Sequence, residues 1–170
     1  MKENIMEILH RAIEIEMFGN YYYNKISNGL QQNEGKAFFK YLANAEEEHM
    51  NTLGQMLDQY GGEAKKTEID NVLATILMGE GIEDMFKGLM SKDKLENVDA
   101  MEALKLGMEV EARSIDFYKK NADKSSELDI ANLFTELSDW EKEHLNLLKE
   151  NLRMLKDEGV WYGYVPILEG

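Results

Sequence analysis

The sequence predicts an all-α protein, an antiparallel four-helix bundle built from two similar helical hairpins. Proline, the residue that most often breaks a helix, occurs once in the 170 residues, at Pro166. Four long segments place apolar residues at alternating steps of three and four, the spacing of a helix that packs in a bundle. The first two segments also match the last two in sequence, which indicates that one hairpin plan is used twice.

The first hairpin comprises residues 5–30 and 39–60. Asn4 and Glu7 have the spacing of an N-terminal capping box, Asn28-Gly29 predicts the end of the first helix, and Gly61-Gly62 predicts the end of the second. The inward positions of the first helix are Ile5, Leu9, Ala12, Glu16, Gly19, Tyr23, Ile26 and Leu30. Those of the second are Phe39, Leu42, Glu46, His49, Leu53, Met56 and Tyr60.

The second hairpin comprises residues 104–122 and 134–152, and Asp99 and Glu102 predict the cap of its first helix. Its inward positions are Leu104, Met108, Glu111, Ile115, Tyr118 and Ala122, then Phe134, Leu137, Glu141, His144, Leu148 and Leu152. Shifting residues 12–57 onward by 95 positions matches 12 of 46 residues, including most of the polar inward positions. The two hairpins are therefore expected to face each other.

A long connector, about residues 61–98, joins the two hairpins. It is long enough to span the length of a helix, so the second and third helices can run parallel, with one long crossover between them. We therefore predict a bundle domain over residues 1–159 that includes this crossover. The aromatic tail, residues 160–170, is expected to lie on the bundle surface or on a neighbouring subunit.

Charge and cysteine content exclude several classes of function. The chain has 33 acidic and 19 basic residues, and its net charge of −14 argues against nucleic acid and membrane partners. It contains no cysteine, which excludes disulfides, thiolate nucleophiles and iron–sulfur clusters. The N-terminal residues lack the apolar run of a signal peptide, so we expect a cytoplasmic protein.

Acidic residues and histidines occupy six inward positions, namely Glu16, Glu46, His49, Glu111, Glu141 and His144. Buried ionised carboxylates need compensation, and no lysine or arginine lies nearby on these inward faces. Two divalent ions would balance the four carboxylates. A glutamate from each of two helices and Glu-x-x-His from each of the other two form the ligand set of a di-iron or di-manganese carboxylate centre. Iron is our first choice, with manganese as the alternative.

A metal-free structural or interaction bundle is the other reading of this pattern, because Glu-x-x-His is common on exposed helix faces. It would require the inward glutamates to be protonated or exposed. Two copies of the motif within an internal repeat favour the metal site. Glu14 and Glu109 also repeat, but their offset of two residues turns them away from the inward face. His10 has no such companions and is expected at the surface or its boundary.

Tyr23 and Tyr118 lie seven residues beyond Glu16 and Glu111, which is two turns along the same helix face. Each hydroxyl could hydrogen-bond to a ligand carboxylate from another helix. Each ring could equally be an ordinary core aromatic, and the sequence leaves the two alternatives open.

The motifs EMFGNYYY, EARSIDFY, EEEH and EKEH resemble those of the rubrerythrin family of ferritin-like proteins, over about residues 5–155. The resemblance implies a ferritin-like bundle whose six inward residues are the metal ligands, with Glu46 and Glu111 bridging two ions. Ser114 stands where rubrerythrins typically carry an extra carboxylate, so His49 is expected to be a permanent ligand. Without cysteine there is no rubredoxin domain, and electrons would come from a separate protein such as a rubredoxin.

Two functions follow from this resemblance and the ligand set. The first is a peroxidase-like oxidoreductase, expected to be a homodimer, whose two iron ions reduce hydrogen peroxide or dioxygen. The alternative is a ferritin-like iron-binding or ferroxidase protein for iron storage or delivery, because an acidic surface attracts cations.

Overall fold

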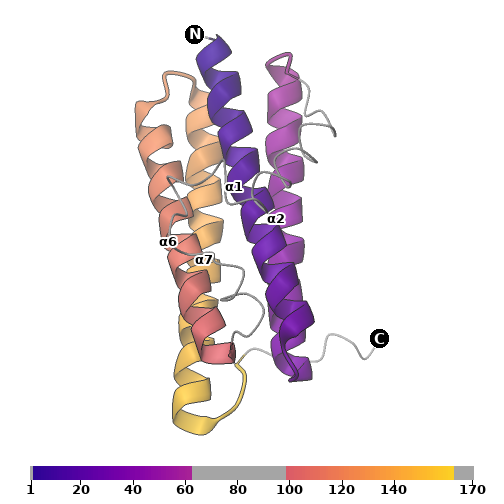
Figure 1. Cartoon of the computed structure of the whole chain (residues 1–170). Helices are drawn as coiled ribbons and strands as arrows, with labels where there is room; N and C mark the ends of the chain where they lie inside the picture. Colours follow the sequence, from indigo (N-terminus) through magenta and orange to yellow (C-terminus); the bar gives the residue numbers. More distant parts are fainter. Residues whose placement is uncertain (1, 63–98, 163–170) are drawn as a thin grey trace, which may run out of the picture.

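Four helices make up the part of the chain that the computed structural model describes, residues 2–62 and 99–162, and no strand occurs within it. The helices are α1 (Lys2–Gly29), α2 (Asn33–Gln59), α6 (Ala100–Lys124) and α7 (Leu128–Glu158). Figure 1 shows them side by side along one long axis. The predicted all-α, four-helix bundle is therefore confirmed.

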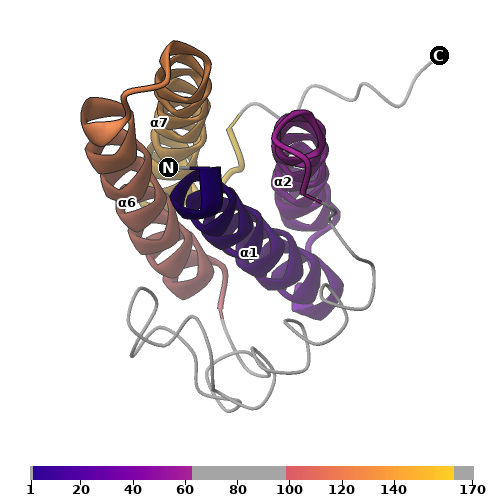
Figure 2. The ribbon, with the colours of Figure 1, turned by 90° about the horizontal axis from the view of Figure 1, so that it is seen from above.

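The helices pair as the two predicted hairpins. Residues 30–32 join α1 to α2, and residues 125–127 join α6 to α7. Packing is most extensive within each hairpin, and α1 also packs against α6, as the end-on view in Figure 2 shows. The helices α2 and α6 run in the same direction (Figure 1), as one long crossover requires. The crossover itself falls on residues 63–98, which lie outside the described residues.

The helix ends follow the sequence signals with one exception. The Asp99 side chain accepts a hydrogen bond from the backbone N–H of Glu102 at 3.0 Å, so the predicted cap of α6 is present. The cap predicted at Asn4 is wrong, because α1 already begins at Lys2 and Asn4 lies inside the helix. No helix-breaking residue precedes Asn4 in the sequence, so nothing there stops the helix from extending.

The core consists of two apolar clusters with a polar layer between them. One cluster contains Tyr22, Phe39, Leu104 and Leu148, and the other contains Leu9, Leu53, Phe134 and Leu137. Along each helix, the inward glutamates and histidines fall between the residues of these two clusters. The apolar clusters therefore hold the four helices together at both sides of the layer and fix the height at which its polar side chains meet.

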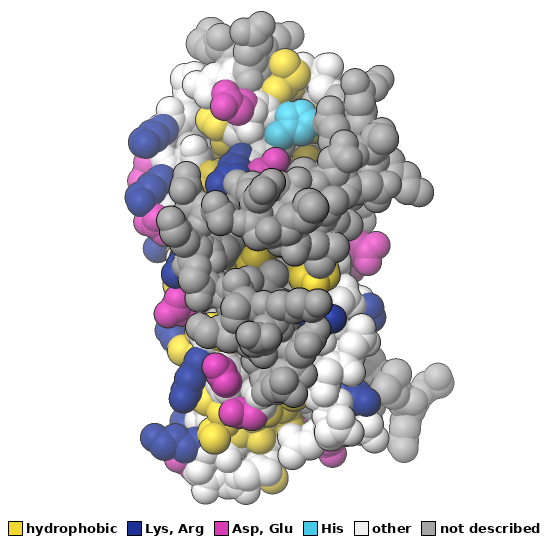
Figure 3. All heavy atoms as spheres, viewed as in Figure 1, with side chains coloured by type: hydrophobic (Ala, Val, Ile, Leu, Met, Phe, Trp, Pro, Cys, Tyr) yellow, Lys and Arg dark blue, Asp and Glu magenta, His cyan; other side chains and the backbone are white. Residues whose placement is uncertain are grey.

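The outer surface carries charged side chains of both signs. Figure 3 shows lysine and arginine side chains gathered along the edge where α6 lies, with acidic side chains between them. The exposed lysines of α6 include Lys105, Lys119, Lys120 and Lys124. Among the described helices, none has a stretch that is apolar enough over a sufficient length to cross a membrane.

The first residues of the C-terminal tail lie on the bundle. The Trp161 ring is 5.9 Å from Phe38 and 6.1 Å from Phe39 between ring centroids, and its indole N–H donates to the Gln32 side chain at 2.9 Å. Gly35 makes room for this ring, because a Cβ there would lie 2.5 Å from Trp161. Trp161 therefore connects the end of α7 to the start of α2. Residues 163–170 lie outside the described part.

Candidate metal centre

All six inward polar residues meet in the middle of the bundle. The helices α1 and α6 each contribute one glutamate, and α2 and α7 each contribute a glutamate and the histidine one turn later. Every one of the six side chains is buried. Their positions in the two hairpins are equivalent, because each pair of counterparts is separated by the same 95 residues.

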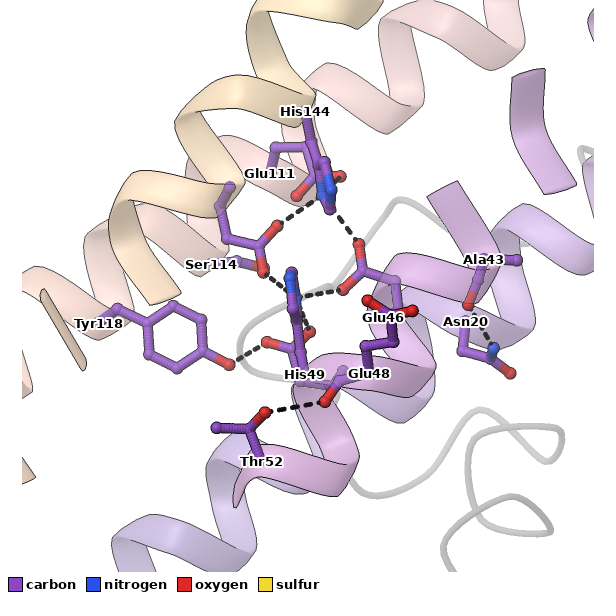
Figure 4. Close-up of polar contacts among 12 residues, drawn as sticks. Asn20, Ala43, Glu46, Glu48, His49, Thr52, Glu111, Ser114, Tyr118 and His144 are labelled. Carbon is purple, nitrogen blue, oxygen red and sulfur yellow. Dashed lines mark hydrogen bonds and ion pairs between the residues drawn. The ribbon is translucent and has the colours of Figure 1, made fainter. Parts of the chain in front are cut away.

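His49 is at the centre of a first group of carboxylates. Its Nδ1 atom lies 3.0 Å from Glu16 Oε2, 3.2 Å from Glu141 Oε1 and 3.4 Å from Glu46 Oε2. Figure 4 draws contacts of the His49 ring as dashed lines, with Glu46 labelled among the side chains around it. One imidazole nitrogen and three carboxylates within this distance form a donor set that suits iron or manganese.

His144 is at the centre of a second group. Its Nδ1 atom lies 3.0 Å from Glu141 Oε2, 3.3 Å from Glu46 Oε1 and 3.7 Å from Glu111 Oε1. In each of the two groups, the candidate ligand atoms all lie within 4.8 Å of one another. The structure thus has two adjacent clusters, each able to hold one metal ion.

Glu46 and Glu141 belong to both clusters. Each presents one carboxylate oxygen to His49 and the other to His144. A carboxylate in this position can bridge two ions. Glu111 belongs to the His144 cluster only, so this geometry favours Glu46 and Glu141 as a bridging pair over the expected pair of Glu46 and Glu111.

The buried cluster balances its own charge through opposite pKa shifts. Burial raises the pKa of Glu16 and of Glu111, and repulsion from Glu141 and Glu46 raises both further. Burial also opposes ionisation of Glu46 and Glu141, but close polar contacts, including those with the two imidazoles, hold the pKa of each carboxyl below its usual range. In the absence of metal, these shifts favour the protonated form of Glu16 and Glu111 and the ionised form of Glu46 and Glu141.

The two histidines supply the matching positive charge. Burial disfavours the charged imidazole, but hydrogen bonds with Glu141 and Glu46 raise the pKa of His144 to about 9. Contacts with Glu141, Glu16 and Glu46 raise the pKa of His49 even further above its usual value. In the absence of metal, the shifts thus favour two charged imidazoles beside two ionised carboxyl groups, a combination with no net charge.

The cluster fits a pair of divalent metal ions. Coordination requires neutral imidazoles and ionised carboxylates, so two divalent ions would replace the protons on two histidines and two glutamates and leave the site neutral again. One oxygen also favours a cation: Glu141 Oε1 is buried and accepts no hydrogen bond within the described structure, although His49 Nδ1 lies 3.2 Å away. The donors and their charges are thus compatible with a metal site.

Comparison with known proteins agrees with this geometry. The family model described as Rubrerythrin matches residues 7–152. The chain belongs to the rubrerythrin family. The family resemblance and the ferritin-like bundle expected from the motifs are therefore confirmed. No curated protein and no solved structure gives a significant match. Membership in the rubrerythrin family suggests oxidoreductase activity.

Two tyrosines connect the hairpins of this rubrerythrin-family protein through its carboxylates. The Tyr23 hydroxyl of α1 donates a hydrogen bond to Glu111 of α6, and the Tyr118 hydroxyl of α6 donates one to Glu16 of α1. The two bonds are equivalent under the internal repeat. The sequence left open whether each tyrosine bonds to a candidate ligand or is an ordinary core aromatic, and the structure shows the hydrogen bonds. Each tyrosine orients a glutamate that belongs to a single cluster.

The acidic residues that were expected to point away do so. Glu14 pairs with Arg11 at 3.0 Å, and Glu109 accepts a hydrogen bond from Arg113 at 3.2 Å. Neither belongs to a cluster. His10 is half-buried and likewise belongs to neither cluster, as expected for a boundary residue.

Ser114 marks the departure from the usual rubrerythrin pattern. Its hydroxyl donates to the backbone carbonyl of Val110 at 3.1 Å, so it offers no carboxylate to compete with His49. The corresponding residue of the first hairpin is Gly19, and a Cβ there would lie 3.2 Å from Glu46 Cδ. Gly19 therefore makes room for a shared carboxylate.

The sequence pattern did not single out Trp140. Its ring stacks on His49, with centroids 5.0 Å apart and planes 16° from parallel. The counterpart of Trp140 in the first hairpin is Ala45, so a large ring stands where the repeat has a methyl group. This break in the repeat, directly before a candidate ligand glutamate, is the sequence signal that could have pointed to Trp140.

Proposed function

We propose that this protein is a di-iron oxidoreductase that reduces hydrogen peroxide or dioxygen with electrons from a separate donor protein. The observation that supports it best is the sharing of Glu46 and Glu141 between two histidine clusters, because shared carboxylates hold two ions next to each other. Two iron ions bound there would supply two electrons and polarise an O–O bond.

The protein's own side chains would hold the ions and exclude water. Glu46 and Glu141 contact both clusters, while Glu16 and Glu111 are each oriented by a tyrosine. Burial raises the pKa of Tyr23 and Tyr118, and the neighbouring carboxylates raise it further, so both hydroxyls keep their protons. Reduction of hydrogen peroxide to two water molecules consumes two electrons and two protons, and these hydroxyls keep two protons in hydrogen bonds to candidate ligands.

The source of electrons is a partner protein in this proposal. The chain has no cysteine with which to hold an iron–sulfur or rubredoxin centre of its own. A rubredoxin-like carrier in the cytoplasm would deliver electrons one at a time to a homodimer. Iron is the proposed metal and manganese the alternative, since carboxylates with one imidazole per ion suit both and either ion can cycle between two oxidation states.

Anaerobic oxidation kinetics test the proposal. The protein is loaded with two ferrous ions per chain and mixed with one equivalent of hydrogen peroxide, and the ferric absorption is followed by stopped flow. We expect faster oxidation by peroxide than by air-saturated buffer, and repeated turnover when rubredoxin and its reductant are added. The Glu46→Ala variant is the matched control, because it removes a shared carboxylate. Oxidation no faster than that of the control would contradict the proposal.

Iron handling is the second candidate, favoured by the net charge of −14, which concentrates cations near the protein. In that case dioxygen would be the preferred oxidant, and more than two irons per chain would be taken up. The same experiment, extended by further additions of ferrous ion in air, separates the two functions.

A further inference from the structure

Three aromatic rings form a continuous stack beside the metal centre. The Trp140 ring stacks on His49, and the His49 ring stacks on His144 with centroids 5.4 Å apart and planes 17° from parallel. Trp140 comes from α7 and His49 from α2, so the stack crosses from one hairpin to the other. Trp140 is half-buried, and it also packs against the apolar cluster that contains Leu53 and Leu137.

The histidines form the side of the site that is closest to solvent. The side chains of His49 and His144 are 7% and 6% exposed, that of Glu46 is 4% exposed, and those of the other three glutamates are at most 1% exposed. Any molecule approaching the cluster from this side meets the imidazoles first. Because the Trp140 ring lies over one face of His49, it covers part of this approach.

Trp140 does not follow the internal repeat, unlike the candidate metal ligands. All six candidate ligands and both tyrosines have identical counterparts in the other hairpin, but the counterpart of Trp140 is Ala45. A methyl group has too little surface to cover His144 as an indole covers His49. The two clusters have the same donors, and one has an additional aromatic wall.

We propose that Trp140 is a specificity-determining residue, which shields the His49 side of the metal centre and limits access to oxidants as small as hydrogen peroxide and dioxygen. The inference rests on the proposed oxidoreductase function for its oxidants. The shielding itself depends only on the stack and on a bound metal ion. Bulky organic hydroperoxides and chelators are the molecules that the indole would keep out.

A chelator measures the shielding without any catalysis. Protein loaded with manganese or ferrous ion is mixed with excess EDTA, and metal release is followed over time. We expect Trp140→Ala to release metal about tenfold faster than the parent, the rate equivalent of losing one aromatic stack. Trp140→Phe keeps a ring over His49 and should stay close to the parent. Trp161→Phe changes the other tryptophan, whose ring lies against Phe38 and Phe39 instead of His49, and is the matched control.

Ala45→Trp is a complementary variant that removes no packing. It places an indole at the equivalent position of the first hairpin, and it should slow the release of metal by EDTA. If Trp140→Ala fails to fold, Ala45→Trp still decides the question. Metal release at the parent rate from both Trp140→Ala and Ala45→Trp would overturn the proposal. If Trp140→Ala does not fold, release at the parent rate from Ala45→Trp alone would overturn it.

Oxidant size completes the test. For the ferrous protein, the rate ratio of tert-butyl hydroperoxide to hydrogen peroxide should rise about tenfold in Trp140→Ala and stay unchanged in Trp161→Phe. An unchanged ratio in Trp140→Ala would contradict the role in oxidant selection. If neither oxidant reacts with the metal-loaded parent, the proposed oxidoreductase function fails, and the EDTA experiment still confirms or overturns the shielding by Trp140.

Discussion

In the α1–α2 hairpin, Gly19 follows the ligand glutamate of the first helix by one turn, and Ala43 and Ala45 precede the shared glutamate of the second. In the α6–α7 hairpin, the same three positions are Ser114, Ser138 and Trp140. The ligands and tyrosines, by contrast, are identical in both. The residues that form or contact the two clusters are therefore the same in both hairpins, and the residues that differ lie next to the clusters.

The difference teaches that the two candidate metal clusters have equal donors in unequal surroundings. Ser138 adds a buried hydroxyl that has no hydrogen-bond partner in the described structure, and Ser114 adds one bonded to its own helix. Trp140 adds a ring over His49. Substitutions at the shared positions should therefore change metal binding equally in the two hairpins. Substitutions at the differing positions should change it unequally.

The largest expected effect comes from the shared carboxylates. Glu46→Ala and Glu141→Ala should each lose both ions, because each glutamate contacts both clusters. His49→Ala and His144→Ala should each lower the metal content by about one ion per chain, because each histidine serves one cluster. Plasma mass spectrometry of reconstituted protein measures both. Glu14→Ala is the control and should keep the parent content; two ions in both histidine variants would refute the ligand assignment.

The metal-free protein should become less stable as the pH rises. Glu16 and Glu111 have raised pKa values, and the pKa of His144 is raised to about 9, so the folded state holds protons that the unfolded chain releases. For His144 this loss of stability falls between the unfolded value of 6.5 and about 9. Urea denaturation of the metal-free protein across this range should show a falling midpoint, whereas metal affinity should rise; a rising midpoint would contradict the charge assignment.

The tyrosines should have intermediate and equal effects. Tyr23→Phe and Tyr118→Phe each remove one hydrogen bond to a candidate ligand, and loss of such a bond typically weakens metal binding about tenfold to a hundredfold. Competitive titration with a chromogenic chelator measures the affinities. Tyr22→Phe is a suitable control, because that hydroxyl donates to the Ala103 backbone instead. A much larger effect in one hairpin than in the other would break the equivalence.

The smallest expected effect distinguishes Gly19 from Ser114. Gly19→Ala places a Cβ about 3.2 Å from Glu46 Cδ and should weaken metal binding several-fold. In the metal-free protein the same contact opposes the roughly 0.5–1 kcal/mol by which Gly to Ala usually stabilises a helix, so the gain in stability should be smaller than that. Ser114→Ala should change neither. Calorimetric melting with and without metal measures both quantities, and equal changes in the two variants would contradict the role of Gly19.

The sequence predicted most of this arrangement, because helix periodicity and burial act locally. A glutamate at an inward position of a regular helix reaches the bundle interior wherever the chain leads afterwards, so Glu16 and Glu111 could be placed from spacing alone. Sharing of Glu141 could not be predicted, because it depends on where two carboxylate oxygens point across four helices. The break in the repeat marks Trp140, but its stack on His49 could not be predicted, since it depends on the distance between α2 and α7.

The stoichiometry of bound metal tests the central claim most directly. Protein reconstituted anaerobically with ferrous ion, freed of excess iron and analysed by plasma mass spectrometry should contain two irons per chain, with one in His49→Ala and one in His144→Ala. A parent protein that binds no iron after reconstitution would contradict the account, and a single iron per chain would contradict the two equivalent clusters on which it rests.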